Sequence, residues 1–243
     1  RNINLDVTLV EMLDQVMAPL DYEMAQILHE HLEQNGINLV LKDGVASFEE
    51  DEQGINVILN SGRRLSADLA ILAVGVKPNS QLARDAGLAV NARGGIIVDE
   101  FLRTSDQDIY AVGDVIEVED FVDKNRIMVP LAGPANKQGR IAANNIAGAY
   151  QRYEGTQGTA IVKVFDLTAA CTGNNERTLL NKGMVKGRDF ETLIINQNHH
   201  AAYYPGAKSL TIKLLFSMDG RKIYGAQIVG AEGVDKRIDI IAV

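Results

Sequence analysis

Apolar and polar positions follow two different patterns in the two parts of this 243-residue chain. Up to about residue 150, short β-branched runs alternate with helical repeats, and this pattern predicts an α/β fold built on parallel sheets. From Tyr153 onward, strand-like runs follow one another with few helices between them, which favours an α+β domain with an antiparallel sheet. The predicted fold class is therefore α/β in the first part of the chain and α+β in the last.

The spacing of apolar residues sets the expected elements. Met24 and Leu28 lie at helical spacing, Asp21 can cap their helix, and Gly36 can end it. The run 69–75 is almost continuously apolar, as expected of a strand buried on both faces. Strands are expected at 5–10, 37–41, 45–50, 55–59, 69–75, 96–98, 159–165, 192–196, 210–216 and 222–229, with a hairpin turn at 51–54. Helices are expected at 21–35, 80–86, 135–149, 175–183 and 235–243.

The composition excludes several functional classes. A net charge of −8 without a Lys/Arg cluster argues against a surface for nucleic acid. No apolar run is long enough to span a bilayer, and residues 1–4 lead directly into a strand rather than forming a secretory signal. The single cysteine, Cys171, excludes an internal disulfide framework and favours a reducing compartment such as the cytoplasm. None of the four histidines has a Cys, Asp or Glu at metal-ligand spacing, so no metal site is expected.

Both ends of the chain are typical of cuts through a longer protein. A strand begins almost at once without a cap or helix before it, and the apolar run 238–243 ends the chain without a stop signal. We therefore expect the chain to be a carboxyl-terminal fragment.

The most informative segment for function is 104–114. A polar, turn-rich run leads into a short apolar strand that ends in Gly113 and Asp114. Nucleotides bind at the carboxyl ends of buried strands, where a glycine lets a ligand approach the backbone and an acid can accept a sugar hydroxyl. The alternative is a buried strand closed by an ordinary Gly-Asp turn.

A second candidate is Glu11, which ends the first expected strand. An acid at this place can accept both hydroxyls of an adenosine ribose and would repel a 2′-phosphate. The next residues, 12–14, contain no Arg or Lys that could hold that phosphate, so NADH is favoured over NADPH. The alternative is a solvated acid at a strand end. The Gly-rich phosphate loop that would precede such a strand is absent from the chain.

These segments together resemble the FAD-dependent pyridine nucleotide–disulfide oxidoreductases. Segment 104–114 is similar to their second flavin-binding motif, whose aspartate (here Asp114, after Gly113) takes the ribitol hydroxyl of FAD. Segment 131–140 is similar to the start of their flavin-facing helix, whose partial positive charge stabilises reduced flavin. The residues that the resemblance assigns to cofactors are Glu11, Ala73, Val74, Gly75, Gly113, Asp114, Leu131, Ala132 and Gly133.

The last part of the chain resembles the dimerisation domain of coenzyme A–disulfide reductases. The similar segments are 158–168, 200–207 and 230–239. In that subgroup the first tyrosine of a Tyr-Tyr-Pro segment reaches the redox centre of the dimer partner, a role that would fall on Tyr203 as the catalytic residue. The alternative is aromatic packing beside a Pro-Gly turn. Cys171 lies in this region, where the family uses a small side chain, and is expected to be a packed residue.

The resemblance implies three domains: residues 1–75 as a partial NAD(P)-binding domain, 76–150 as the second segment of an FAD-binding domain, and 151–243 as a truncated dimerisation domain. It implies an enzyme that passes hydride from NAD(P)H through FAD to coenzyme A disulfide or a related disulfide or persulfide, as a homodimer. NADH oxidase and persulfide reductase activities on the same scaffold, or a non-catalytic dimerisation module, are the alternatives. The fragment lacks the family's redox cysteine and is expected to be inactive by itself.

Overall fold

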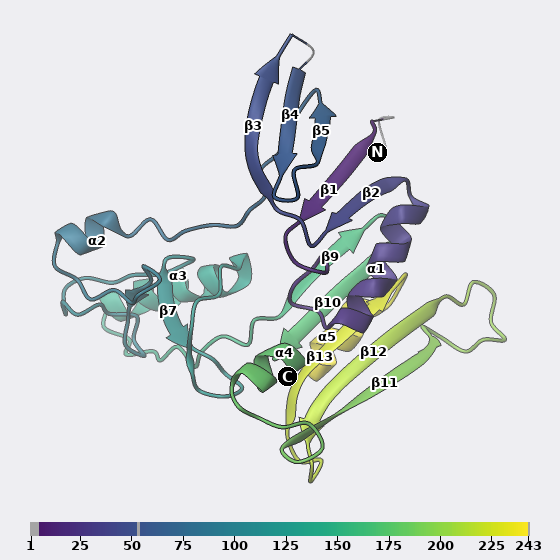
Figure 1. The fold of residues 1–243 in the computed structure, drawn as a ribbon. Helices are drawn as coiled ribbons and strands as arrows, with labels where there is room; N and C mark the ends of the chain where they lie inside the picture. Colours follow the sequence, from purple (N-terminus) through teal and green to yellow (C-terminus); the bar gives the residue numbers. More distant parts are fainter. Residues whose placement is uncertain (1–4, 53, 243) are drawn as a thin grey trace. The chain divides into compact units, whose positions relative to one another are not determined.

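The computed structural model describes residues 5–52 and 54–242 (Figure 1). The chain divides into two compact units: residues 1–73 with 161–243 form the first, and residues 74–160 form the second. Residues 1–4, where we expected the chain to be cut from a longer protein, are not among the described residues. Among the described residues, no helix is both long and apolar enough to cross a membrane.

The first unit begins with a β-α-β arrangement. Strand β1 (Val7–Glu11) pairs in parallel with β2 (Ile37–Leu41), and helix α1 (Tyr22–Gln34) connects them. Both strands and the helix confirm the elements expected at 5–10, 37–41 and 21–35. Residues at helical spacing on α1, including Met24 and Leu28, are buried in the core, which explains why the apolar repeat located this helix.

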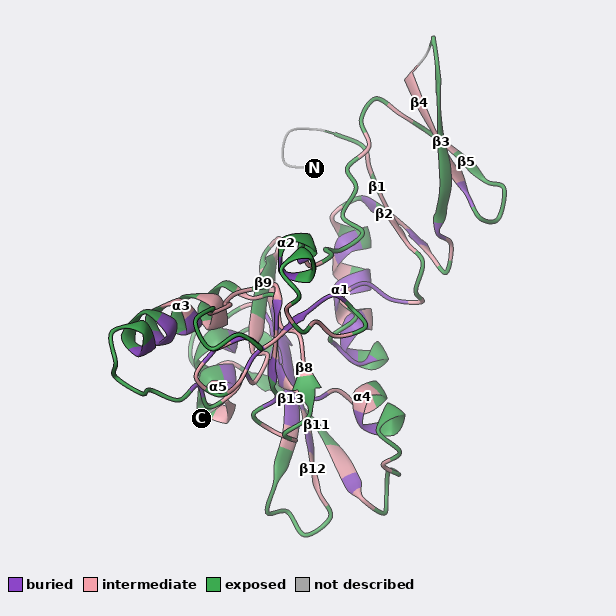
Figure 2. Ribbon diagram, turned by 90° about the vertical axis from the view of Figure 1, so that its left-hand side faces the viewer, coloured by how far each residue is buried: buried purple, intermediate pink, exposed green. Residues whose placement is uncertain are grey.

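A separate antiparallel sheet follows, made of β3 (Val45–Asp51), β4 (Gly54–Leu59) and β5 (Arg64–Ala67). The expected hairpin between 45–50 and 55–59 is confirmed by the pairing of β3 with β4, although Gln53 of its turn lies outside the described residues. Strand β3 is exposed along its whole length (Figure 2). The sequence did not predict β5.

The strand expected at 69–75 is wrong. These residues form no strand, and Ile71 and Val74 are 84% and 88% exposed. A strand needs a neighbour to pair its N–H and C=O groups, and among the described residues no strand pairs with this run. An apolar run alone therefore did not suffice to form a strand.

The carboxyl-terminal part of the first unit is a five-stranded sheet in the order β11-β12-β13-β10-β9. The pairs β11–β12, β12–β13 and β13–β10 are antiparallel, which confirms the expected α+β arrangement. The elements are β9 (Ala160–Val164), β10 (Leu167–Gly173), α4 (Glu176–Asn181), β11 (Phe190–Asn198), β12 (Ser209–Ser217), β13 (Ile223–Gly230) and α5 (Val234–Ile241). The sequence did not predict β10, and Val243 of the last expected helix lies outside the described residues.

Both faces of this sheet are covered. Successive residues of a strand point to opposite faces: Ala169 on β10 packs in the core that contains α1, whereas Ala170 packs in the core that contains α5. Strand β13, between β12 and β10, is buried over most of its length (Figure 2). Cys171 is half-buried against the α1 core, in agreement with a packed role.

The second unit contains α2 (Gln81–Asp85), β6 (Ile96–Ile97), β7 (Ile116–Glu119), β8 (Arg126–Ile127) and α3 (Ala132–Ile146). Strands β6 and β7 are parallel, and their core includes Leu102 and Ile141. The short strand expected immediately before Gly113 is wrong, because that stretch forms only an isolated bridge between Arg103 and Tyr110. The strand of this region, β7, begins after the Gly-Asp turn, since its partner β6 lies beside residues 116–117.

Candidate functional site

The second unit contains a pocket of about 690 Å³ beside the Gly-Asp turn. Asp114 supplies a carboxylate to its lining, and three basic residues, Lys77, Arg84 and Arg93, supply positive charge. A hydroxyl-rich ligand that also carries phosphate fits such a mixture, because a carboxylate accepts hydroxyl protons and basic groups bind phosphate oxygens.

The Gly-Asp turn is fixed by a neutral hydrogen-bond chain. Gly113 has a φ of +84°, a conformation that favours glycine. Its N–H donates to Oε1 of Gln138 on α3 at 2.8 Å, and Nε2 of Gln138 donates to the hydroxyl of Tyr153 at 3.2 Å. The Tyr153 hydroxyl also contacts the Thr156 hydroxyl. Sequence reasoning missed Gln138, although its place on the buried face of α3, three residues before Ile141, was a usable signal.

The start of α3 exposes backbone donors. Leu131 occupies the N-cap position without a side-chain cap, and Ala132 and Gly133 form the first exposed positions of the helix. N–H groups in a first turn have no partner within the helix. Pro134 has no N–H, and the N–H of Ala135 donates to the Leu131 carbonyl. The N–H groups of Ala132 and Gly133 therefore lie in the first turn of the helix, where N–H groups can bind an anionic group.

The three junction residues do not form a strand end. Ala73 belongs to the first unit, whereas Val74 and Gly75 belong to the second. Gly75 has a φ of +98°, in an exposed segment without regular secondary structure. The residues that follow it, Val76 and Lys77, line the same pocket as Asp114, so the segment borders that pocket through them.

In the first unit, Glu11 is the last residue of β1. Its Oε1 accepts the N–H of Leu13 at 2.9 Å, so the carboxylate also closes the turn that follows the strand. The carbonyl of Glu11 accepts the N–H of Asp43, next to the end of β2. These bonds hold the carboxylate at the ends of two parallel strands, the place where a ribose is bound in dinucleotide folds.

Tyr203 lies in the loop between β11 and β12. Its side chain is 90% exposed. The neighbouring Tyr204 is also exposed and packs edge-on against the ring of His200, with centroids 5.9 Å apart. Tyr203 is therefore exposed to solvent and is not packed in the core.

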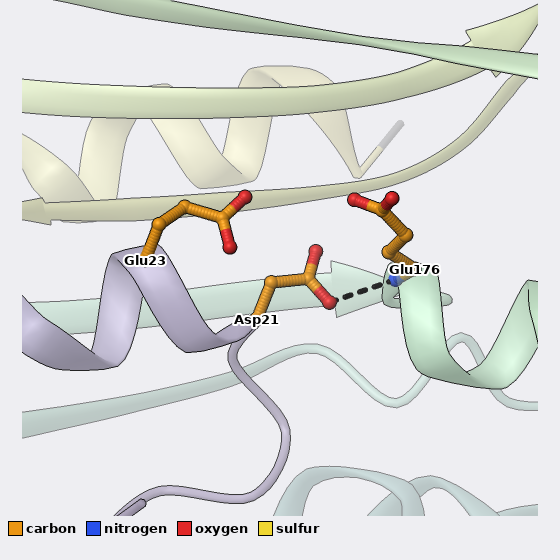
Figure 3. Close-up of side chains that lie close together, drawn as sticks. All are labelled: Asp21, Glu23 and Glu176. Carbon is orange, nitrogen blue, oxygen red and sulfur yellow. Dashed lines mark hydrogen bonds between the residues drawn. The ribbon is translucent and has the colours of Figure 1, made fainter. Parts of the chain in front are cut away.

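A buried charge cluster in the first unit escaped sequence reasoning. Asp21, Glu23 and Glu176 place carboxylate oxygens within 4.8 Å of one another (Figure 3), a spacing that could hold a metal ion. Nζ of Lys213 is 2.7 Å from Asp21 and 2.8 Å from Glu176, and it also contacts Glu23. The lysine ammonium thus supplies the positive charge for all three acids.

The pKa values in this cluster follow from its contacts. Burial tends to lower the pKa of Lys213, but hydrogen bonds to Asp21, Glu176 and Glu23 outweigh it and raise the pKa above its ordinary value. Burial tends to raise the pKa of Glu176, but hydrogen bonds from Lys213 and Lys186 lower it overall. Both groups are therefore charged near neutral pH.

Comparison with known proteins identifies the parts of the chain. Residues 1–139 match the family model described as pyridine nucleotide-disulphide oxidoreductase, and residues 159–243 match the dimerisation domain of the same family. The chain is 35% identical to an NAD(P)H sulfur oxidoreductase (CoA-dependent) from Pyrococcus furiosus and 31% identical to a coenzyme A disulfide reductase from Staphylococcus epidermidis; in each case the match covers 98% of this chain and 52% of the relative.

A solved structure agrees with these relatives. The crystal structure of reduced Bacillus anthracis CoADR-RHD superimposes with a TM-score of 0.94 and 50% sequence identity, over all of this chain and 42% of that one. The chain spans about half the length of the curated relatives that it matches. The family resemblance inferred from the Gly113–Asp114 turn and the carboxyl-terminal segments is confirmed: the chain belongs to the pyridine nucleotide-disulphide oxidoreductase family.

Proposed function

We propose that the intact protein is an FAD-dependent oxidoreductase that passes electrons from NADH to coenzyme A disulfide or a related disulfide or persulfide. The observation that carries this proposal is the Gly113–Asp114 turn, which opens on a pocket lined by three basic side chains in a chain of this family. Proteins related to this chain are named for NAD(P)H, sulfur and coenzyme A.

The residues present fit FAD. Asp114 would accept a ribitol hydroxyl, and the basic residues of the pocket would balance phosphate charge. The first-turn N–H groups of Ala132 and Gly133 would stabilise negative charge on the flavin. When bound, FAD supplies the hydride acceptor and returns the electrons to sulfur. The chain's own contribution is to bind and orient the cofactor and to hold its charge.

The nucleotide and the substrate would use the first unit. Glu11 would bind the adenosine ribose of NADH. Ala73, Val74 and Gly75 would be the segment of chain that connects the NAD(P)-binding and FAD-binding domains. Tyr203, which is exposed, would reach the redox centre of a second copy and donate a hydrogen bond to sulfur. We place the divisions at residues 1–75, 76–150 and 151–243, and the homodimer in the cytoplasm, in keeping with the single cysteine.

The overall reaction balances without another reductant. NADH gives up a hydride, one proton is taken up, the disulfide S–S bond breaks, and NAD⁺ and a pair of thiols form. Cys171 packs against the core and is not assigned to this chemistry. The redox cysteine is expected outside these residues, so the 243-residue chain by itself should be inactive.

The test is FAD binding by the intact protein with Asp114→Ala. Losing a hydrogen bond to a charged group should weaken FAD affinity by about 10- to 100-fold. The matched control is Asp108→Ala, an exposed aspartate of the same unit, which should bind FAD normally. Equal affinity in all three proteins would contradict the assignment of Asp114. In parallel, thiol release from coenzyme A disulfide and oxygen consumption, both with NADH, would separate the disulfide reductase from the NADH oxidase alternative.

A further inference from the structure

The loop that follows Glu11 is fastened to a distant part of the sequence. Residues 12–21 connect β1 to α1 and contain no regular secondary structure, yet Gln15 and Asp21 are buried. A loop usually lies on the surface, where water satisfies its backbone. Here side chains from residues 175–227 provide the partners instead, and the loop is drawn into the core.

The middle of the loop is held by side chains at the start of α4. Nη2 of Arg177 donates to Oε1 of Gln15 at 3.1 Å, and Nε2 of Gln15 donates to the Leu20 carbonyl at 2.8 Å. Nδ2 of Asn175 lies 3.3 and 3.2 Å from the carbonyls of Ala18 and Pro19. Three residues of the loop are therefore bonded directly to two side chains near the start of α4, and Gln15 passes this support on to Leu20.

The end of the loop is held by the charge cluster. Oδ1 of Asp21 accepts the N–H of Glu176 at 2.9 Å (Figure 3), and Oδ2 of Asp21 accepts from Nε2 of Gln227 at 2.7 Å. The N–H of Asp21 donates back to Oε1 of Gln227 at 2.6 Å. Lys213, which is fully buried on β12, completes the arrangement with its ion pair to Asp21.

Lys213 is the critical residue of the charge cluster because it pairs with all three acids. One ammonium faces the carboxylates of Asp21, Glu23 and Glu176, with a further contribution from Lys186 to Glu176. Without that ammonium, three carboxylates would remain within 4.8 Å of one another, and their repulsion would displace Asp21, which is the buried one.

The geometry points to Lys213 as a positioning residue for nucleotide binding: through Asp21 and the loop 12–21, the dimerisation-domain sheet sets the position of Glu11 and so the affinity for NADH. This inference rests on the proposed role of Glu11. The loop 12–21 and Lys213 belong to different domains of the family. Residues 1–139 match its oxidoreductase model, and residues 159–243 match its dimerisation domain. The dimerisation domain thus contributes to the nucleotide site as well as to association.

The test compares NADH affinity in the intact protein and in Lys213→Met, which keeps the length of the side chain but removes its charge. We expect NADH to bind about tenfold more weakly, with unchanged FAD affinity and an unchanged rate at saturating NADH. The control is Lys186→Met, which removes the half-exposed lysine that pairs with the same Glu176 and should leave NADH affinity unchanged.

A double variant separates this inference from the proposed function. If Lys213 acts through Glu11, then Lys213→Met should add little to the loss of NADH affinity caused by Glu11→Gln. Normal NADH binding by Glu11→Gln would overturn the role of Glu11. A loss in Glu11→Gln together with normal binding by Lys213→Met, or fully additive losses, would overturn the role of Lys213 and leave that of Glu11 intact.

Two further measurements test the inference without relying on NADH binding by Lys213→Met, and the second does not require that variant to fold. Amide hydrogen exchange without nucleotide should speed up at Val16 and Asp21, whose N–H groups are bonded to His29 and Gln227. Arg177→Met releases the same loop at Gln15 without touching the buried charges and should also weaken NADH binding. Unchanged exchange in Lys213→Met, or tight NADH binding by a folded Arg177→Met, would contradict the inference.

Discussion

The two candidate cofactor carboxylates are held in place by different chemistry. Asp114 follows a turn that is fixed by uncharged groups, with Gly113, Gln138 and Tyr153 linked by hydrogen bonds. Glu11 precedes a loop that ends at a buried ion cluster around Lys213. Neutral amide and hydroxyl groups keep their bonds over a wide pH range, whereas a buried ion cluster fails when one charge is removed. The Gly113–Asp114 turn should therefore resist changes of charge and pH better than the loop 12–21.

The largest expected effect comes from breaking the ion cluster. Lys213→Met leaves Asp21, Glu23 and Glu176 without their shared counter-charge and should lower the free energy of unfolding of the first unit by about 3–5 kcal/mol, because Asp21 is buried. Urea unfolding monitored in the intact protein would measure it. A loss no larger than that of a surface variant would show that the cluster does not hold the loop.

The next largest effect is expected when the uncharged hydrogen-bond chain from Gly113 through Gln138 to Tyr153 is broken. Gln138→Leu removes the acceptor of the Gly113 N–H and a donor to Tyr153, and should cost about 1–3 kcal/mol in the stability of the second unit. It should also weaken FAD binding, because the Gly-Asp turn loses its support. Asn136→Ala, an exposed position on the same helix, is the control and should change neither quantity.

A smaller, pH-dependent effect is expected at His29. Its Nε2 accepts the N–H of Val16 in the loop 12–21 at 3.0 Å. Burial lowers the pKa of His29 below 6.5. The negative charges of Glu33 and Asp14 act to raise this pKa but are outweighed. The folded state then binds fewer protons than the unfolded state. The contribution of neutral His29 to the free energy of unfolding is therefore present above pH 6.5, and it is lost as the pH falls from 6.5 through the lower pKa of the folded state.

His29→Gln should flatten this part of the stability profile, since glutamine can accept the same bond without titrating. Urea unfolding at a series of pH values below neutrality, for the native protein and the variant, measures the difference. Parallel profiles would show that His29 does not titrate with folding.

The smallest effect is expected for a surface pair. Lys208 and Glu232 lie 2.7 Å apart, and both side chains are more than half exposed. Lys208→Gln should leave the free energy of unfolding unchanged within error, because water and salt screen such a pair. A marked loss would mean that surface charges contribute to this fold as the buried cluster does.

The sequence predicted the fold where local pattern and tertiary burial agree. Helix α1 was located by its apolar repeat because those same residues fill the core. The run 69–75 was equally apolar, but strand formation depends on a pairing neighbour, which composition does not reveal. Strand β10 was missed because its small residues, such as Ala169 and Ala170, carry little of the β-branched signal.

The candidate site was predicted only where residues near one another in sequence carry it. Gly113 and Asp114 are adjacent, and the structure places Asp114 on a pocket. Asp21 and Lys213 are far apart in the chain, and a lysine inside a strand gives no sign that it is buried among acids. Gln138 was missed for the same reason, because its partner Gly113 lies 25 residues away.

We expect the intact protein to hold FAD at the Gly113–Asp114 turn and to accept electrons from NADH. The most direct test is the visible absorption spectrum of the purified intact protein before and after anaerobic addition of NADH. The account predicts oxidised-flavin bands that bleach on addition and return with coenzyme A disulfide. A protein without flavin bands, even after incubation with FAD, or flavin bands that NADH does not bleach, would contradict it.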